Sequence, residues 1–177
     1  ALFLVGLGVA LPGRPGLAQQ PVLALGYKHT LGVGGVPWLR TAAQLNQPQG
    51  VAGGDSVWVA DSAGRRALHF DTAGRYLDEV GRAGLVRGVY AGPVRWVADV
   101  ATSFDVPAGA DPNDPAARLE VLWLVDPVAH DVVGLVMDTG ETTVLGEPDV
   151  PGADDDHLRA PIGVAVDAKG NVYVSDT

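Results

Sequence analysis

Short apolar runs separated by turn-forming residues make up most of this chain of 177 residues. The runs are rich in Val, Leu, Trp and Tyr, and Gly, Pro and Asp fall between them. Such runs are typical of β-strands, because a helix needs a longer stretch with an apolar period of about 3.6. The pattern therefore predicts an all-β fold, with almost no helix in residues 45–177.

One part of this pattern occurs twice. Residues 45–52 (LNQPQGVA) and 57–61 (VWVAD) are matched by residues 158–165 (LRAPIGVA) and 172–176 (VYVSD). Asp71 and Gly74, like Asp167 and Gly170, stand at the first and fourth positions of a tight turn, where Asp accepts local N–H bonds and Gly adopts positive φ. The recurrence indicates a repeat built of hairpins.

The complete unit spans residues 45–81, and a degenerate unit spans 82–147. Strands are expected at 50–52, 57–60, 66–70 and 76–80 in the first unit, and at 93–99, 121–126, 131–137 and 142–146 in the second. Consecutive apolar residues at 57–59 indicate a strand packed on both faces. In the second unit, Asp131 occupies the place that Arg66 holds in the first.

Three further segments complete the expected organisation. Residues 102–118 contain three prolines and four Asp or Asn residues, so they are expected to form a loop inserted between two strands. Residues 148–157 are an acidic connector, and residues 158–177 are the first half of a further unit. The sequence is therefore expected to be a fragment of a longer repeat protein.

Together these motifs resemble the NHL repeat, the four-stranded blade of NHL-type β-propellers. The resemblance implies a partial, open propeller of four-stranded antiparallel blades, six-bladed when complete, with the missing blades completing the ring. One departure is Gly64, where NHL repeats usually carry Asn, and another is Ala67, where a bulkier β-branched residue is common. The structural repeat residues are Pro48, Gly50, Asp61, Arg66, Gly74, Asp126, Pro161, Gly163, Asp167, Gly170 and Asp176.

The recurrent charged residues are expected to be structural. Asp61, Asp126 and Asp176 end the second strand of each unit, where a carboxylate caps a turn more readily than it acts as a catalytic acid. Arg66 matches the usual Arg of the repeat, and its expected role is a hydrogen bond or ion pair between blades. No catalytic residue is assigned.

The N-terminal residues are expected to direct export. Residues 1–11 are apolar or Gly and are followed by small residues at Gly16 and Ala18, as in a signal peptide over 1–18 whose own start is missing. The run is too short to cross a bilayer, although a buried strand or the remnant of a membrane anchor are alternatives. Residues 19–44 are a lead-in strand or linker. The expected location is extracytoplasmic, periplasmic or secreted.

The composition of the chain narrows the classes of partner that the protein is expected to bind. The net charge of −9 and the scattered Lys and Arg residues argue against nucleic-acid binding, because an acidic surface repels phosphates. The absence of cysteine excludes disulfides, so stability must come from burial. Ten of the twelve basic residues are Arg, which together with abundant Ala and Gly favours a bacterial source.

Chemical motifs are few. His29, His69, His130 and His157 have no metal-ligand spacing, and no serine lies in a nucleophile elbow. The acidic residues at 154–156 and 111–115 could coordinate calcium, although they lack the ligand order of a calcium loop. We expect a binding scaffold for a protein, peptide or glycan ligand, with no cofactor.

The alternative is an enzyme. The NHL resemblance also implies a metal-dependent propeller lyase or lactonase, similar to the peptidyl-hydroxyglycine lyase or to gluconolactonases. Zinc or calcium would then sit in the channel, held mostly by residues of the missing blades.

Overall fold

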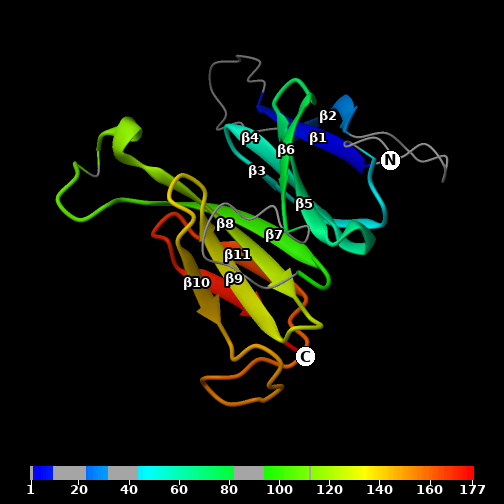
Figure 1. Ribbon diagram of the computed structural model, residues 1–177. Coiled ribbons are helices and arrows are strands. Elements are labelled where there is room, and N and C mark those ends of the chain that lie inside the picture. Colours follow the sequence, from blue (N-terminus) through cyan, green and yellow to red (C-terminus); the bar gives the residue numbers. More distant parts are fainter. Residues whose placement is uncertain (1, 10–22, 32–43, 82–93, 112) are drawn as a thin grey trace, which may run out of the picture.

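The structure is a computed structural model that describes residues 2–9, 23–31, 44–81, 94–111 and 113–177 (Figure 1). Within these ranges the regular structure is β apart from two single-turn 3-10 helices, η1 (Ser62–Gly64) and η2 (Pro115–Ala117). All strand pairs are antiparallel. The strands are β1 (Leu2–Val9), β2 (Leu23–Leu31), β3 (Pro48–Gly53), β4 (Ser56–Asp61), β5 (Arg66–Asp71), β6 (Tyr76–Val80), β7 (Asp99–Asp105), β8 (Leu119–Asp126), β9 (Asp131–Val136), β10 (Thr142–Leu145), β11 (Gly163–Val166) and β12 (Val172–Ser175).

Two four-stranded sheets form the body of the protein. The first sheet has the order β3-β4-β5-β6 and the second has the order β7-β8-β9-β10, so each is a chain of hairpins between sequence neighbours. A third sheet contains β11 and β12, and a fourth contains β1 and β2. The all-β expectation, with four antiparallel strands in each of the two units, is confirmed.

The first strands of the first, second and third sheets lie side by side. β7 contacts β3 on one side and β11 on the other, and β11 also contacts β8. Figure 1 shows the first sheet in cyan to green, the second in green to yellow, and β11 against the second sheet. We call β3, β7 and β11 the inner strands.

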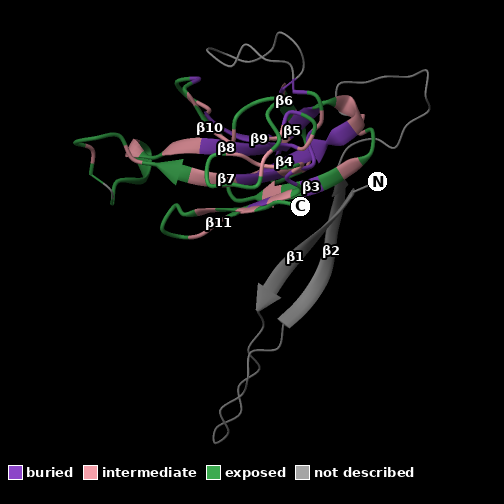
Figure 2. Ribbon diagram, turned by 90° about the horizontal axis from the view of Figure 1, so that it is seen from below, coloured by how far each residue is buried: buried purple, intermediate pink, exposed green. Residues whose placement is uncertain are grey.

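Two apolar layers of the core lie one on each face of the second sheet. Leu122 and Leu124 of β8 face the first layer, with Trp58 and Val97. Trp123 and Val125 alternate to the opposite face and pack in the second layer, with Val164. Figure 2 shows the resulting buried residues at the centre of the stacked sheets. Burying each of these large side chains contributes about 1.5–3 kcal/mol.

The expectation that the strand at 57–60 is covered on both faces is also confirmed. Residues from Val57 to Asp61 are all buried. One face of β4 packs in the layer shared with the second sheet, through Trp58 and Ala60. Val57 and Val59 face the other way, in a separate cluster with Leu68 and Phe70 of β5.

The first strand of the second unit differs from the sequence prediction. Residues 94–98 are not a strand, and β7 begins at Asp99 and continues to Asp105, into the segment expected to be a loop. The hairpin is longer because Thr102 and Ser103 continue to pair with β8, opposite Leu122 and Val121. The prolines of the insertion start only at residue 107, so nothing prevents pairing before that point.

At the N-terminus, β1 pairs with β2 from Leu2 opposite Leu31 to Val9 opposite Leu23. The apolar segment expected to belong to an export signal is thus a strand, and β2 lies within the segment expected to be a lead-in strand or linker. Residues 10–22, with the expected cleavage site, lie outside the described residues, and the export signal stays a prediction. No helix in the described ranges is long and apolar enough to cross a membrane.

Candidate functional site

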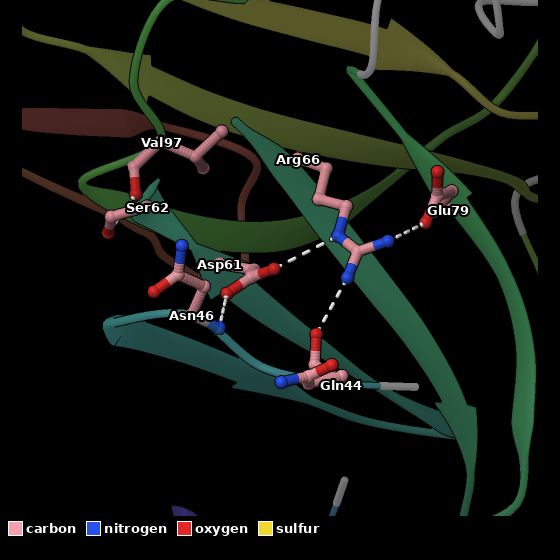
Figure 3. Close-up of polar contacts among 7 residues, drawn as sticks. All are labelled: Gln44, Asn46, Asp61, Ser62, Arg66, Glu79 and Val97. Carbon is pink, nitrogen blue, oxygen red and sulfur yellow. Dashed lines mark hydrogen bonds and ion pairs between the residues drawn. The ribbon is translucent and has the colours of Figure 1, made fainter. Parts of the chain in front are cut away.

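A buried polar network closes the end of the first sheet at which β4 turns into β5 (Figure 3). Asp61 is fully buried and its Oδ2 accepts a hydrogen bond from Nε of Arg66 at 2.9 Å, while Oδ1 accepts the N–H of Asn46. Arg66 also donates to the carbonyl of Gln44 at 2.7 Å and to the carboxylate of Glu79. The guanidinium therefore bridges three segments of one unit.

This arrangement corrects the role expected for Arg66. Among the described residues, the hydrogen-bond partners of Arg66 all lie within residues 44–79, so it links segments of the first sheet and not neighbouring sheets. The first and second sheets are instead joined by the hydroxyl of Ser62, which donates to the carbonyl of Val97 at 2.6 Å. The indole N–H of Trp58 adds a second link, to Glu120 at 3.2 Å.

The close packing of this network explains why residue 64 is a glycine. A Cβ at this position would lie 2.0 Å from Oδ2 of Asp61 and 3.1 Å from Nε of Arg66. A larger residue there would displace the ion pair, so glycine at this position matches the close approach of Asp61.

The aspartates that end β4, β8 and β12 occupy equivalent places. Asp126 accepts four backbone N–H bonds, from Arg95, Trp96, Val128 and Ala129. Asp176, directly after β12, accepts the N–H of Arg159 with both oxygens. In each unit the carboxylate thus fixes the segment that precedes the inner strand.

Asp131 is the exception among these charged groups. It lies opposite Asp126 in the β8–β9 ladder, as Arg66 lies opposite Asp61 in the β4–β5 ladder. Its residue exposure is 1%, and within the described part of the chain neither carboxylate oxygen has a hydrogen-bond partner. Burial, with repulsion from Asp126 and Asp149, raises the pKa of Asp131 to about 6. A perturbed, buried acid is a functional-site signal, although structural positions produce it as well.

A second carboxylate, Asp99, lies on the inner strands. Trp58, Trp123 and Tyr173 are paired with Ala52, Ala101 and Ala165 respectively. The residues two positions before these alanines are Gly50, Asp99 and Gly163, which we call the inner row. Oδ2 of Asp99 accepts the N–H of Val164 at 3.1 Å, so the side chain reaches from β7 to β11.

The sequence contained a signal for Asp99 that the expected strand at 93–99 obscured. Residues 99–101 (DVA) correspond to 50–52 (GVA) and 163–165 (GVA). The expected strand at 93–99 instead ended at Asp99. In the structure β7 begins at Asp99, and Val97 precedes it.

The turn residues lie where the repeat requires them. Gly74 and Gly170 have positive φ, and their N–H groups bond to the carbonyls of Asp71 and Asp167. The carboxylate of Asp167 accepts from Lys169, Asn171 and Tyr173. These hydrogen bonds hold its pKa below the usual value, with those from Asn171 first.

The histidines at 69, 130 and 157 contact different groups and do not gather around one site. His69 is stacked on Trp58, with ring centroids 4.1 Å apart, and its Nδ1 is 3.0 Å from Asp78. His130 lies in the turn before β9, where its Nδ1 accepts the N–H of Ala160. His157 contacts Asp154 and Glu147 in the acidic connector.

The part of the chain that the structure describes contains no assembled set of metal ligands. No group of three or more His, Asp or Glu residues there is arranged to hold a metal ion. The carboxylates of Asp111 and Asp154 accept local bonds from Asn113 and Asp156 respectively. The zinc or calcium of the enzyme alternative stays an untested prediction.

No protein-family model matches the chain. No curated protein sequence matches it either.

Proposed function

We propose that this chain is part of an exported NHL-type β-propeller that serves as a binding scaffold for a protein, peptide or glycan ligand. The proposal concerns a binding protein and not an enzyme.

The contact between inner strands supports the propeller. In a propeller, four-stranded sheets surround a central channel and pack on one another face to face. Here β7 lies between β3 and β11, and apolar layers separate the first sheet from the second and the second from β11–β12. A six-bladed ring would need further blades beyond these sheets.

The insertion between β7 and β8 is the observation that carries the binding proposal. This loop, residues 106–118, extends from the hairpin end of the second sheet (Figure 1). Most of its described residues are exposed, and Phe104, next to its base, is 51% exposed. Exposed loops on a rigid β-scaffold are common sites of recognition.

The loop is also ordered by its own hydrogen bonds. Oδ1 of Asp111 accepts from the backbone N–H of Asn113 at 2.9 Å and from its side chain at 3.2 Å. Asp114 caps η2 by accepting the N–H of Ala116 at 2.9 Å. Prolines at 107 and 115 restrict the backbone further. A loop organised in advance loses less entropy when it binds a ligand.

The test is to replace residues 107–117 by an Asn-Gly turn in the full chain. We would compare the two proteins on a glycan array and on a peptide array. A ligand found for the parent chain should bind the loop variant at least about 10-fold more weakly. A matched control carries D154N, D155N and D156N in the acidic connector and should bind as the parent does.

Two outcomes would overturn the proposal. One is equal binding by the loop variant when circular dichroism shows both proteins folded. The other is turnover of a lactone or a peptidyl-hydroxyglycine substrate, which would indicate the enzyme alternative.

A further inference from the structure

The inner row contains one side chain with charge between two glycines. Asp99 lies level with Gly50 of β3 and Gly163 of β11, because all three precede the equivalent Val-Ala pairs. Since both neighbours lack a side chain, the Asp99 carboxylate is the only functional group that these three equivalent positions contribute.

The orientation of this carboxylate is fixed from both sides. Oδ2 accepts the N–H of Val164 at 3.1 Å. Oδ1 lies over Gly50, where a Cβ would be only 2.1 Å away, so any residue other than glycine would displace it. A Cβ at Gly163 would lie 3.6 Å from Oδ2. The two glycines therefore provide the space in which the carboxylate spans from β3 to β11.

One oxygen of Asp99 is free for a ligand. Among the described residues no donor bonds to Oδ1, and no Lys, Arg or His forms an ion pair with Asp99. In contrast, Asp126 and Asp167 each accept four hydrogen bonds. Asp99 is half-buried, so its charge is only partly hydrated, and a cationic donor would gain a charge-assisted hydrogen bond.

We propose that Asp99 binds a basic side chain, an arginine guanidinium or a lysine ammonium, of a protein or peptide ligand at the inner row. This inference rests on the proposed binding function and adds the chemistry of the ligand. The anchored Oδ2 holds the carboxylate in place, and Oδ1 accepts from the cation. The acidic net charge of the chain, −9, would also favour the approach of a basic ligand.

The experiment uses the full chain and three small probes, argininamide, lysinamide and citrullinamide. Each probe is Nα-acetylated, so that only the side chains of the first two carry a charge and citrullinamide is a neutral isostere. Binding is followed by the amide NMR signal of Val164, which reports on the carboxylate directly. Argininamide or lysinamide should shift this signal, less so at high salt, and citrullinamide should not. In D99N the affinity should fall about 10-fold or more, since the charge is lost while an acceptor oxygen remains.

Two variants control the result. D105N removes an exposed carboxylate from the far end of the same strand and should change the affinity less than about 2-fold. D99G restores the glycine found at both equivalent positions, and it should abolish binding even if D99N perturbs the fold.

The proposal fails if no basic probe moves the Val164 signal, if citrullinamide is as effective, or if D99N and D99G bind as the parent does. These results are read at the inner row and not at the loop 106–118. A failure here would therefore leave the result of the loop replacement unchanged, and the two proposals can be judged separately.

Discussion

Asp131 lies directly opposite Asp126 in the β8–β9 ladder, so two carboxylates are paired where the first sheet pairs a carboxylate with a guanidinium. Val144 takes the place in the second sheet that Glu79 holds in the first. Glu79 lies opposite the residue two positions after Arg66, and Val144 lies opposite the residue two positions after Asp131. The second sheet therefore keeps a counterpart of Asp61, namely Asp126, but has no counterpart of the Arg66 guanidinium or of the Glu79 carboxylate. Asp126 compensates with backbone N–H bonds, whereas Asp131 does not.

The first prediction is that D131N stabilises the protein at neutral pH. The pKa of Asp131 is raised to about 6 in the fold, from an ordinary value of 3.8, so the folded state prefers the protonated acid. The free-energy cost of ionising the buried Asp131 carboxylate is therefore absent below about pH 4 and is complete once the pH has risen through 6. At pH 7 D131N should gain roughly 1–3 kcal/mol in free energy of unfolding, and the gain should vanish near pH 4.

Urea unfolding of the parent and the variant at both pH values checks this prediction. D138N, at an exposed carboxylate in the next turn, is the matched control and should show no such pH dependence. A stabilisation by D131N that is equal at pH 4 and pH 7 would contradict the titration argument.

The second prediction concerns the ion pair at the end of the first sheet. R66M removes the guanidinium from a fully buried Asp61 and should cost about 3–5 kcal/mol in free energy of unfolding. R75M breaks the exposed pair with Asp71, in which the arginine side chain is 82% exposed, and should cost less than about 1 kcal/mol. Similar losses in denaturant unfolding for the two variants would show that burial of Asp61 is not decisive.

The third prediction tests the contact between Gly50 and Asp99. G50A should destabilise the protein by about 1–3 kcal/mol, because the added Cβ would overlap Oδ1 of Asp99. G53A on the same strand adds a Cβ with nothing within 4 Å and should be close to neutral. In thermal unfolding, the double variant G50A/D99G should lose less than the sum of the two single variants. Simple additivity would argue against the contact.

The fourth prediction is that His157 titrates above the usual value of 6.5. The hydrogen bond that the His157 ring donates to the Asp154 carboxylate raises the pKa of His157, with a further contribution from Glu147. Its stabilising effect is therefore present below about pH 6.5 and is lost as the pH rises through the folded-state pKa. An NMR titration should show the raised midpoint, and D154N should lower it. If D154N leaves the midpoint unchanged, the contact does not persist in solution.

The sequence predicted the strands of the first unit because local signals agree there. The Asp and Gly residues at 71 and 74 define a turn, and the apolar residues at 57–59 identify a strand covered on both faces. The start of β7 could not be predicted in the same way. Val97-Ala98 looks locally like Val51-Ala52, and only pairing with β8 and contact with β3 and β11 set the register.

The candidate site was harder to predict than the fold. That Asp131 replaces Arg66 is visible in the sequence, but its lack of a partner depends on what surrounds it in space. The role of Asp99 depends on two glycines that are 49 positions before it and 64 positions after it. No local pattern reports such a contact, since it exists only when three inner strands lie side by side.

The two apolar layers on the second sheet also have a consequence for synthesis. One face is covered by the first sheet, which leaves the ribosome earlier, and the other by β11–β12, which emerges later. Translation proceeds at about 5–20 residues per second, so the face with Trp123 and Val132 would stay open for on the order of seconds after β10 is made. The nascent chain thus exposes an apolar surface that a chaperone can bind before the third hairpin covers it.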